Sequence, residues 1–321
     1  MRALVYTRYG GPEVLRLENR PKPVPGNGEV LVRIRASSIN SWDWDLLRGK
    51  PFLSRLGGLF SPPHPILGAD IAGTVEAAGP KTKKFRPGDA VFGDISGCGW
   101  GGFAEHVSVP EKILAFKSPK QSFEEAASLP QAGVLALQGL RMNGPIQAGQ
   151  KILINGAGGG VGTFAIQIAK SCGAVVTAVD SAEKGELLKS LGAHKVLDYA
   201  REDFAQDGKR YNLILDMVAA RPIAAYQRSL YPNGRLVVIG GSTGLILKIL
   251  FLGPWYSGVD RKKFALLFHR PNAADLDALK ELCESGAIKP VIERSYSLEE
   301  APEAIRRLGE GKALGKCVVS I

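Results

Sequence analysis

The chain has 321 residues, of which 45% are hydrophobic and 22% charged, so it is long enough for two domains and ordinary for a globular protein. Its formal net charge of +10 raises the question of nucleic-acid binding. The basic runs at 81–86, 209–210 and 261–263 are separated in sequence and carry no series of interleaved aromatic residues. We therefore expect no nucleic-acid partner and interpret the charge as a solvated basic surface.

The cysteines and the N-terminal segment indicate the expected compartment. The four cysteines, at positions 98, 172, 283 and 317, form no C-x-x-C pair and fit neither a disulfide framework nor a zinc knuckle. No charged-then-apolar leader precedes the first strand pattern, and no apolar run reaches the length that spans a bilayer. We expect a soluble, cytoplasmic protein.

Residues 1–121 have the pattern of an all-β domain. Short alternating or β-branched runs, such as 29–35 and 66–75, are separated by turns rich in Gly and Pro. Glycines interrupt the β-branched residues within 66–75, which is typical of strands that meet at the corner of a barrel.

Residues 122–265 instead alternate between strand and helix patterns. Helices are predicted at 123–129, 131–141 and 183–191, and strands at 151–154, 174–179, 195–199, 211–216 and 235–240. This alternation predicts right-handed crossovers and a parallel sheet. The remaining residues, 266–321, are predicted to add a helix at 274–285, a strand at 290–293, a helix after a capping box at Ser297, and a last strand at 316–321.

The α/β part is organised around the glycine loop, residues 156–162. It follows a strand pattern and precedes the helical pattern 163–170, an order typical of a dinucleotide-binding βαβ unit. Glycines allow a close approach to a pyrophosphate, and the helix N-terminus offers N–H groups and the positive end of its dipole. Ala157 replaces the first glycine of the G-x-G-x-x-G pattern, whereas the overlapping frame of Gly156, Gly159 and Gly162 is complete.

The segment 245–268 has no role in this scheme. Its apolar residues are interleaved with Lys248 and followed by Arg261-Lys262-Lys263. The pattern fits a lid or dimer contact, and also a peripheral membrane contact. We favour the contact between protein surfaces and expect a monomer or a homodimer.

The order of these parts resembles the medium-chain dehydrogenase/reductase superfamily over essentially the whole chain, and most closely its zinc-free, quinone oxidoreductase-like (zeta-crystallin-like) branch. The stretches that carry the resemblance are 38–44, 65–75, 85–92, the glycine loop, 191–199 and 315–316. It implies an α/β fold with a Rossmann-type doubly wound parallel sheet plus a GroES-like β-barrel catalytic domain. Residues 1–121 would begin the catalytic domain, 122–265 would bind the nucleotide, and 266–321 would complete the catalytic domain.

The resemblance also implies that the protein holds no metal. The superfamily's zinc enzymes carry Gly-His-Glu where this chain has Gly68-Ala69-Asp70, and their cysteine ligand falls near Asn40. Their four-cysteine lobe is missing, because Cys98 stands alone in that loop. Tetrahedral zinc needs three or four close N, S or O ligands, and this sequence offers no such set.

A nicotinamide dinucleotide is the implied cofactor. The residues expected to bind it are Asn40, Gly156, Ala157, Gly158, Gly159, Gly160, Val161, Asp180, Ser181, Lys184, Tyr199, Ile239, Gly240 and Lys316. NADP(H) is favoured over NAD(H), because Ser181, Lys184 and Tyr199 stand where the branch gathers donors for the 2′-phosphate. Asp180 opposes this prediction, since an acidic residue there favours the ribose 2′-hydroxyl of NAD(H), unless its side chain caps the next helix.

The implied reaction is hydride transfer to a quinone or to an α,β-unsaturated carbonyl, which needs positioning and an oxygen-stabilising donor but no metal. Asn40 and Asp43 match the branch's Asn-x-x-Asp pattern and are the expected catalytic residues, with Asn40 as the polar contact and Asp43 supporting it. The tyrosines often found downstream are replaced by Asp45 and Pro51. A second hypothesis therefore stays open: an NADPH-binding, non-catalytic structural or interaction protein.

Overall fold

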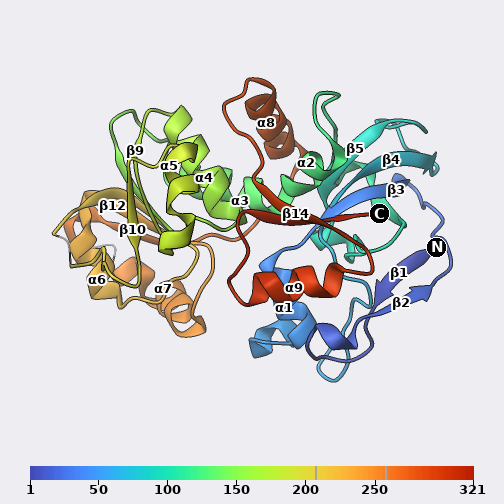
Figure 1. The fold of residues 1–321 in the computed structure, drawn as a ribbon, viewed down its shortest axis with the longest axis horizontal. Helices are drawn as coiled ribbons and strands as arrows, with labels where there is room; N and C mark the ends of the chain where they lie inside the picture. The colour runs from blue at the N-terminus through green and yellow to red at the C-terminus, as the bar shows by residue number, and fades with distance from the viewer. Residues whose placement is uncertain (207, 257–258) are drawn as a thin grey trace. The chain divides into compact units, whose positions relative to one another are not determined.

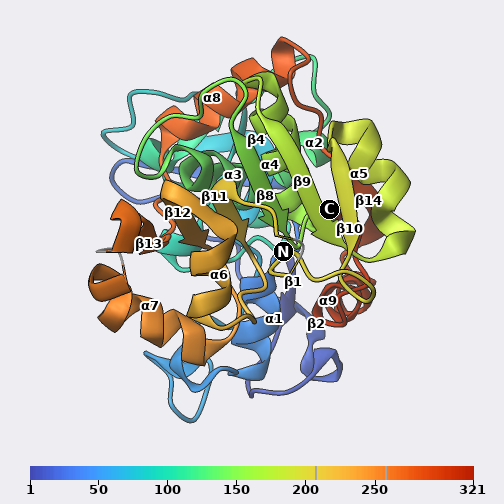
Figure 2. The same cartoon turned by 90° about the vertical axis from the view of Figure 1, so that its left-hand side faces the viewer.

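The computed structural model describes residues 1–206, 208–256 and 259–321, which divide into two compact units. The first unit comprises residues 1–134, 271–285 and 290–321, and the second comprises 135–270 and 286–289. Figures 1 and 2 show the elements of both units. The unit boundaries differ from the predicted domain limits after residues 121 and 265 by 13 and five residues, respectively.

The first unit is mainly β. Its strands are β1 (Arg2–Val5), β2 (Arg16–Asn19), β3 (Glu29–Ser38), β4 (Asp70–Ala78), β5 (Ala90–Asp94), β6 (His106–Pro110), β7 (Leu114–Phe116), β14 (Ile292–Ser297) and β15 (Lys316–Ser320). Its helices are α1 (Ser41–Arg48), α2 (Phe123–Ser128), α8 (Ala273–Glu284) and α9 (Ala301–Gly309), and α3 (Pro130–Arg141) continues into the second unit.

The long strand β3 organises the large sheet of this unit, which has the order β14-β15-β3-β4-β5-β7. One edge of β3 pairs with β4 along almost its whole length. The other edge is shared, because residues 29–33 pair with β6 and residues 36–38 pair with β15. Two register shifts in the β3–β4 pair add local twist, as bulges at barrel rims do. These features confirm the predicted GroES-like domain.

Helix α2 explains why the first unit extends beyond residue 121. A capping box between Ser122 and Glu125 fixes its start, as acidic residues in a first turn favour. Its buried residues Ala126, Ala127 and Ser128 belong to a face that packs on β3, β4 and β15. The helical pattern in the sequence predicts α2 correctly but carries no information about the sheet that it covers.

The second unit is built on a six-stranded sheet. Its strands are β8 (Lys151–Asn155), β9 (Val175–Asp180), β10 (Lys195–Asp198), β11 (Tyr211–Asp216), β12 (Leu230–Val238) and β13 (Lys263–Leu266). Its helices are α4 (Gly160–Ser171), α5 (Gly185–Leu191), α6 (Ile223–Ser229) and α7 (Thr243–Tyr256).

Every strand pair in this sheet is parallel, and the order is β10-β9-β8-β11-β12-β13. The chain moves outward from β8 to β10 and then returns to β11 on the other side of β8. This order confirms the predicted Rossmann-type, doubly wound sheet, with its switch point between β8 and β11. Ligands of such sheets bind beyond the carboxyl ends of the strands at that point.

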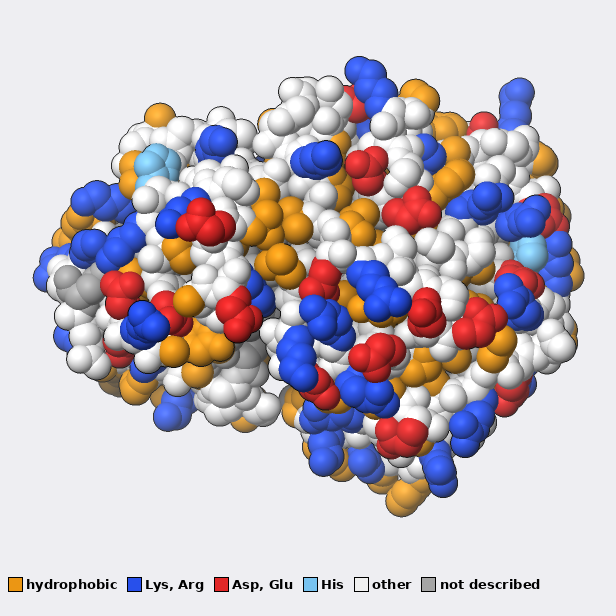
Figure 3. Space-filling view, viewed as in Figure 1, with side chains coloured by type: hydrophobic (Ala, Val, Ile, Leu, Met, Phe, Trp, Pro, Cys, Tyr) orange, Lys and Arg blue, Asp and Glu red, His pale blue; other side chains and the backbone are white. Residues whose placement is uncertain are grey.

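The segment 245–268 forms most of α7 and all of β13, and its residues 257 and 258 lie outside the described residues. Leu245, Ile249 and Phe264 are buried in the core of the second unit. No helix within the described ranges is long and apolar enough to cross a membrane. On the face shown in Figure 3, basic and acidic side chains are interspersed and do not form a continuous basic stripe.

Close packing at the start of α4 gives a first prediction. A Cβ atom at Gly162 would lie 2.5 Å from the backbone of Ala157 and Gly156, whereas one at Gly159 would lie 3.6 Å from its nearest neighbour. Gly162→Ala should therefore lower the free energy of unfolding by roughly 1–3 kcal/mol, the range found for overpacking. Urea denaturation without cofactor measures this, with Gly159→Ala as the matched control. Equal effects of the two substitutions would contradict the packing argument.

Candidate functional site

The glycine loop is closed against the end of β9. The N–H groups of Gly156 and Ala157 both donate to the carbonyl oxygen of Val179, at 3.0 and 3.1 Å. Gly156 has a φ of +83°, which the left-handed turn after β8 requires. Helix α4 starts at Gly160, and its N-cap, Gly159, has no side chain to satisfy the first N–H groups. These N–H groups, from Gly160 and Val161 onward, are available to an anion.

Asp180 ties this loop to the end of β9. Its Oδ2 atom accepts the Gly158 N–H at 2.7 Å, and its Oδ1 atom accepts the Ser181 N–H at 2.9 Å. The Lys184 Nζ atom lies 3.3 Å from Oδ1 and forms an ion pair. The sequence left open whether Asp180 binds a ribose or caps the next helix. In the structure its buried carboxylate holds Gly158 and Lys184 in place.

The other predicted cofactor residues in this unit lie at the same edge of the sheet. Tyr199 follows β10, and its N–H donates to the Asp180 carbonyl oxygen at 3.2 Å, while its side chain is exposed. Ile239 and Gly240 follow β12, and the Ile239 N–H donates to the Asp216 carbonyl oxygen at 2.9 Å. The carboxyl ends of four strands, β8, β9, β10 and β12, thus carry the predicted residues.

Asp216, at the end of β11, is a residue of this edge that the sequence analysis missed. Its fully buried carboxylate accepts hydrogen bonds from the Asn155 side chain at 2.9 Å and the Tyr226 hydroxyl at 2.8 Å. The N–H groups of Val218 and Ala219 also donate to it. Burial, and then the charge of Asp216, raises the pKa of Tyr226, so the hydroxyl remains a donor. Asp216 therefore fixes the loops on both sides of the switch point.

The donors at this edge fit a dinucleotide. Free N–H groups at the start of α4 suit a pyrophosphate, and Lys184, Ser181 and Tyr199 suit a ribose or its phosphate. Position 158 of the loop also favours glycine, because a Cβ atom there would lie 2.4 Å from the Lys184 side chain. We call this set of residues the dinucleotide edge.

A second polar site lies in the first unit, where five residues form a buried group that we call the Asn40 cluster: Ser38, Asn40, Asp43, Asp70 and Lys316. Asp43 accepts the Asn40 N–H at 2.7 Å and the Gly68 N–H at 2.9 Å. Burial raises the pKa of Asp43 to about 7, although both N–H donors oppose the shift. Since both carboxylate oxygens hold backbone groups, Asp43 acts as a positioning residue for Asn40.

The carboxamide of Asn40 is held from two sides. Its Oδ1 atom accepts a hydrogen bond from Lys316 Nζ at 2.6 Å. Its Nδ2 atom donates to Asp70 Oδ2 at 3.0 Å and, more weakly, to the Ser38 carbonyl oxygen at 3.4 Å. The structure thus joins two residues of the predicted site, Asn40 and Lys316, through direct contact.

Asp70 completes this cluster. Its carboxylate accepts the Ser38 hydroxyl at 2.8 Å and the Gln131 N–H at 2.9 Å, and it lies 3.5 Å from Lys316 Nζ. Burial raises the pKa of Asp70, and the Lys316 ammonium opposes that shift. Throughout the described part of the chain, no group of three or more His, Cys, Asp or Glu side chains could hold a metal ion. An ammonium group instead faces the carboxylate at the position of a zinc-ligand motif.

Two family models match the chain: Alcohol dehydrogenase GroES-like domain over residues 26–120, and Zinc-binding dehydrogenase over residues 191–319. The chain is 33% identical to the quinone-oxidoreductase QR1 of Triphysaria versicolor, covering 99% of this chain and 98% of that protein. It is 34% identical to the chloroplast envelope quinone oxidoreductase homolog of Arabidopsis thaliana, with the same coverage. The solved quinone oxidoreductase from Coxiella burnetii matches with a TM-score of 0.90 and 28% identity, covering 100% of this chain and 99% of that one.

The fold, the dinucleotide edge and these relatives define the class of protein. The chain belongs to the medium-chain dehydrogenase/reductase superfamily. Within it, the chain belongs to the quinone oxidoreductase-like branch, as the sequence predicts.

The buried Lys316–Asp70 pair gives a second prediction. Lys316→Met removes the cation but leaves a buried carboxylate, so the free energy of unfolding should fall by roughly 3–5 kcal/mol. The double variant Asp70→Asn/Lys316→Met should be less destabilised than the sum of the two single variants. Denaturation of all four proteins measures the coupling, and exposed Lys312→Met serves as a control. Additive effects would contradict a direct interaction.

Proposed function

We propose that the protein is an NADPH-dependent reductase of quinones or α,β-unsaturated carbonyl compounds that works without zinc. The observation that carries the proposal is the Lys316 ammonium bonded to Asn40, at the place where zinc enzymes of the superfamily keep their ligands. An ammonium there disfavours a bound cation and supplies a positive charge of its own. The printed names of the quinone oxidoreductase relatives also support this substrate class.

When bound, the reduced nicotinamide supplies the hydride. The dinucleotide edge would hold the cofactor through the first N–H groups of α4 and through Lys184. The charge of Asp180 is compensated, because its oxygens accept two N–H groups and pair with Lys184. This compensation lowers the repulsion of a 2′-phosphate, and Ser181 and Tyr199 offer further hydroxyl donors. Both features favour NADP(H) over NAD(H).

The cofactor preference is the third prediction. Lys184→Ala should weaken NADPH binding by roughly 10–100-fold, because it removes a charge-assisted contact and leaves Asp180 uncompensated. NADH binding should change much less. Fluorescence-quenching titrations with both cofactors measure the difference, and Lys189→Ala, which pairs with Glu186 on the same helix, is the control. Tenfold tighter binding of NADH by the unsubstituted protein would contradict the NADP(H) preference.

The Asn40 cluster supplies the polar group for the acceptor. Reduction of a quinone or enone develops negative charge on an oxygen, which a positioned donor stabilises. Lys316 withdraws electron density through Oδ1 and thereby strengthens the N–H donors of Asn40. The weak 3.4 Å bond to the Ser38 carbonyl oxygen is the one that a substrate oxygen can replace. Asp70 holds the carboxamide in this orientation, and Asp43 holds the backbone N–H of Asn40.

One observation favours the second candidate function, cofactor binding without catalysis. The Asn40 side chain is almost fully buried, at 5% exposure, and both of its polar atoms already have partners. Such a cluster could serve the stability of the first unit alone. The two candidates predict different outcomes in one assay.

The assay is NADPH oxidation with a panel of quinones, short 2-alkenals and aryl enones, which forms the fourth prediction. The unsubstituted protein should oxidise NADPH with at least one acceptor class, and turnover should be unaffected by a metal chelator. Asn40→Ala should lower turnover roughly 100-fold, the scale of a lost oxyanion donor, with a smaller effect on NADPH affinity. NADPH binding with no oxidation by any acceptor would favour the second candidate. Stoichiometric zinc lost together with activity would overturn the zinc-free proposal.

A further inference from the structure

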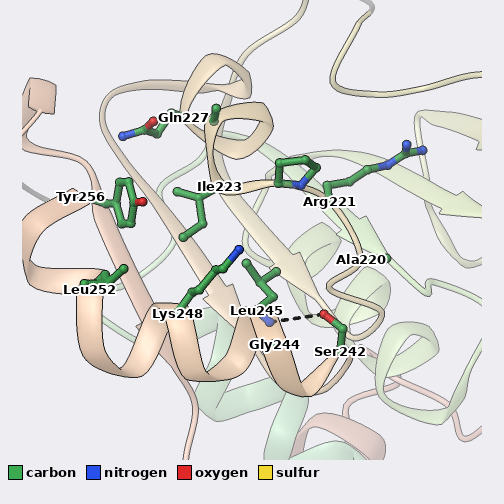
Figure 4. Close-up of a pocket in the computed structure, with 12 residues that line it drawn as sticks. Ala220, Arg221, Ile223, Gln227, Ser242, Gly244, Leu245, Lys248, Leu252 and Tyr256 are labelled. Carbon is green, nitrogen blue, oxygen red and sulfur yellow. Dashed lines mark hydrogen bonds between the residues drawn. The ribbon is translucent and has the colours of Figure 1, made fainter.

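A cavity of ≈570 Å³ lies between α6 and α7 in the second unit, within the size range of small-molecule sites. Figure 4 shows its two walls, with Ile223 and Gln227 on α6 and Leu245, Lys248 and Leu252 on α7. None of the residues of the dinucleotide edge lines it. The cavity therefore has to be explained separately.

Core packing and the Ser242 side chain hold the elements around this α6–α7 pocket in place. Ile223 and Leu245 are buried members of the unit's hydrophobic core. The Ser242 hydroxyl donates to the Ala219 carbonyl oxygen at 2.9 Å and accepts the Leu245 N–H at 3.4 Å. These bonds join the loop after β11 to the start of α7, so two of the segments that line the pocket are held together.

The lining combines apolar side chains with two basic residues, Lys248 and Arg221. Ile223 on α6 and Leu252 and Tyr256 on α7 supply apolar side chains, and the Lys248 side chain extends from α7 toward α6 in Figure 4. Arg221 also lines the pocket, but it forms an ion pair with Asp203 at 3.3 Å. Within residues 1–206, 208–256 and 259–321, Lys248 forms no ion pair, and α7 contains no Asp or Glu. Among the described residues, Lys248 is thus a cation without an ion-pair partner, and it lies beside apolar side chains.

The apolar surface continues beyond the pocket along α7. Leu247, Phe251 and Trp255 follow each other at intervals of four residues, and Phe251 and Trp255 are 74% and 85% exposed. A ligand chain too long for the cavity would therefore remain on apolar surface. Exposed contiguous apolar area of this kind usually marks a binding surface.

We propose that the α6–α7 pocket binds an anionic amphiphile, with a carboxylate or phosphate head at Lys248 and an apolar chain against Ile223, Leu252 and Tyr256. Two sources supply this chemistry: a free fatty acid and an anionic lipid in a bilayer. The second source would give the peripheral membrane contact through 245–268 that the sequence left open. No residue of the dinucleotide edge or of the Asn40 cluster lines the pocket, so the proposal is independent of the reductase chemistry.

The test uses dodecanoate, its uncharged analogue dodecanol, and vesicles of phosphatidylcholine with or without phosphatidylglycerol. Binding of the soluble probes is measured by calorimetry and that of vesicles by co-sedimentation. The unsubstituted protein should bind dodecanoate at least tenfold more tightly than dodecanol. Lys248→Met should abolish this preference, and Ala224→Phe, which fills the mouth from the exposed face of α6, should weaken both soluble probes.

Lys263→Met, an exposed lysine on β13 outside the pocket, is the matched control. Circular dichroism and retained NADPH binding show that each variant is folded. Loss of dodecanoate binding in the Lys248 variant but not in the control supports the pocket. Vesicle binding that needs phosphatidylglycerol and Lys248 identifies the bilayer as the source, and dodecanoate binding without vesicle binding identifies the free acid. No binding of either probe, or equal losses in the Lys248 and Lys263 variants, would overturn the proposal.

Discussion

The first unit depends on an ion pair that water does not reach. The Lys316 ammonium is 3% exposed, the Asp70 carboxylate is fully buried, and Asn40 bridges them. Burying either charge alone would cost several kcal/mol, so each requires the other. Asp70 starts β4, Lys316 starts β15, and Asn40 precedes α1. The pair therefore ties residues of the first 134 to the last strand, which belongs to the same unit. Hydrogen bonds from the Ser38 hydroxyl and the Gln131 N–H also stabilise the buried Asp70 carboxylate.

The second unit uses carboxylates in the same way, at the ends of parallel strands. Asp180 and Asp216 end β9 and β11, and each accepts at least two backbone N–H groups from adjoining loops. Such bonds cost less conformational entropy than bonds to mobile side chains, because a backbone donor has no side-chain rotamer freedom to lose. The N–H groups of Gly156 and Ala157 donate to Val179, and that of Gly158 donates to Asp180. Within the described residues, the first N–H groups of α4 are left for another acceptor. The anion-binding capacity of the dinucleotide edge thus follows from where the other N–H groups are satisfied.

The sequence predicted features that short-range patterns encode, and it missed those that depend on distant partners. The strand of 29–35, the helix of 131–141 and the turn at Gly192 follow from periodicity and glycine conformation, and the structure has them within three residues. Asn40 and Lys316 could be singled out only by resemblance, and their contact across 276 positions has no local signal. The role of Asp216 was missed for the same reason. Helix α2 was predicted but assigned to the other part of the chain, since its pattern does not identify the sheet that buries it.

The chemistry available to the Asn40 cluster follows from the kind of cation it contains. A divalent metal would bind a substrate oxygen directly, whereas Lys316 is saturated by Asn40, the Ile39 carbonyl oxygen and Asp70. In the proposed reductase, its charge would act on a substrate through the Asn40 carboxamide, as a strengthened N–H donor. In the proposed reaction, such a donor would suit acceptors whose developing charge is already delocalised, as in quinones and conjugated carbonyls. Since burial raises the pKa of Asp43 to about 7, the net charge behind Asn40 also becomes more negative as the pH rises through neutrality.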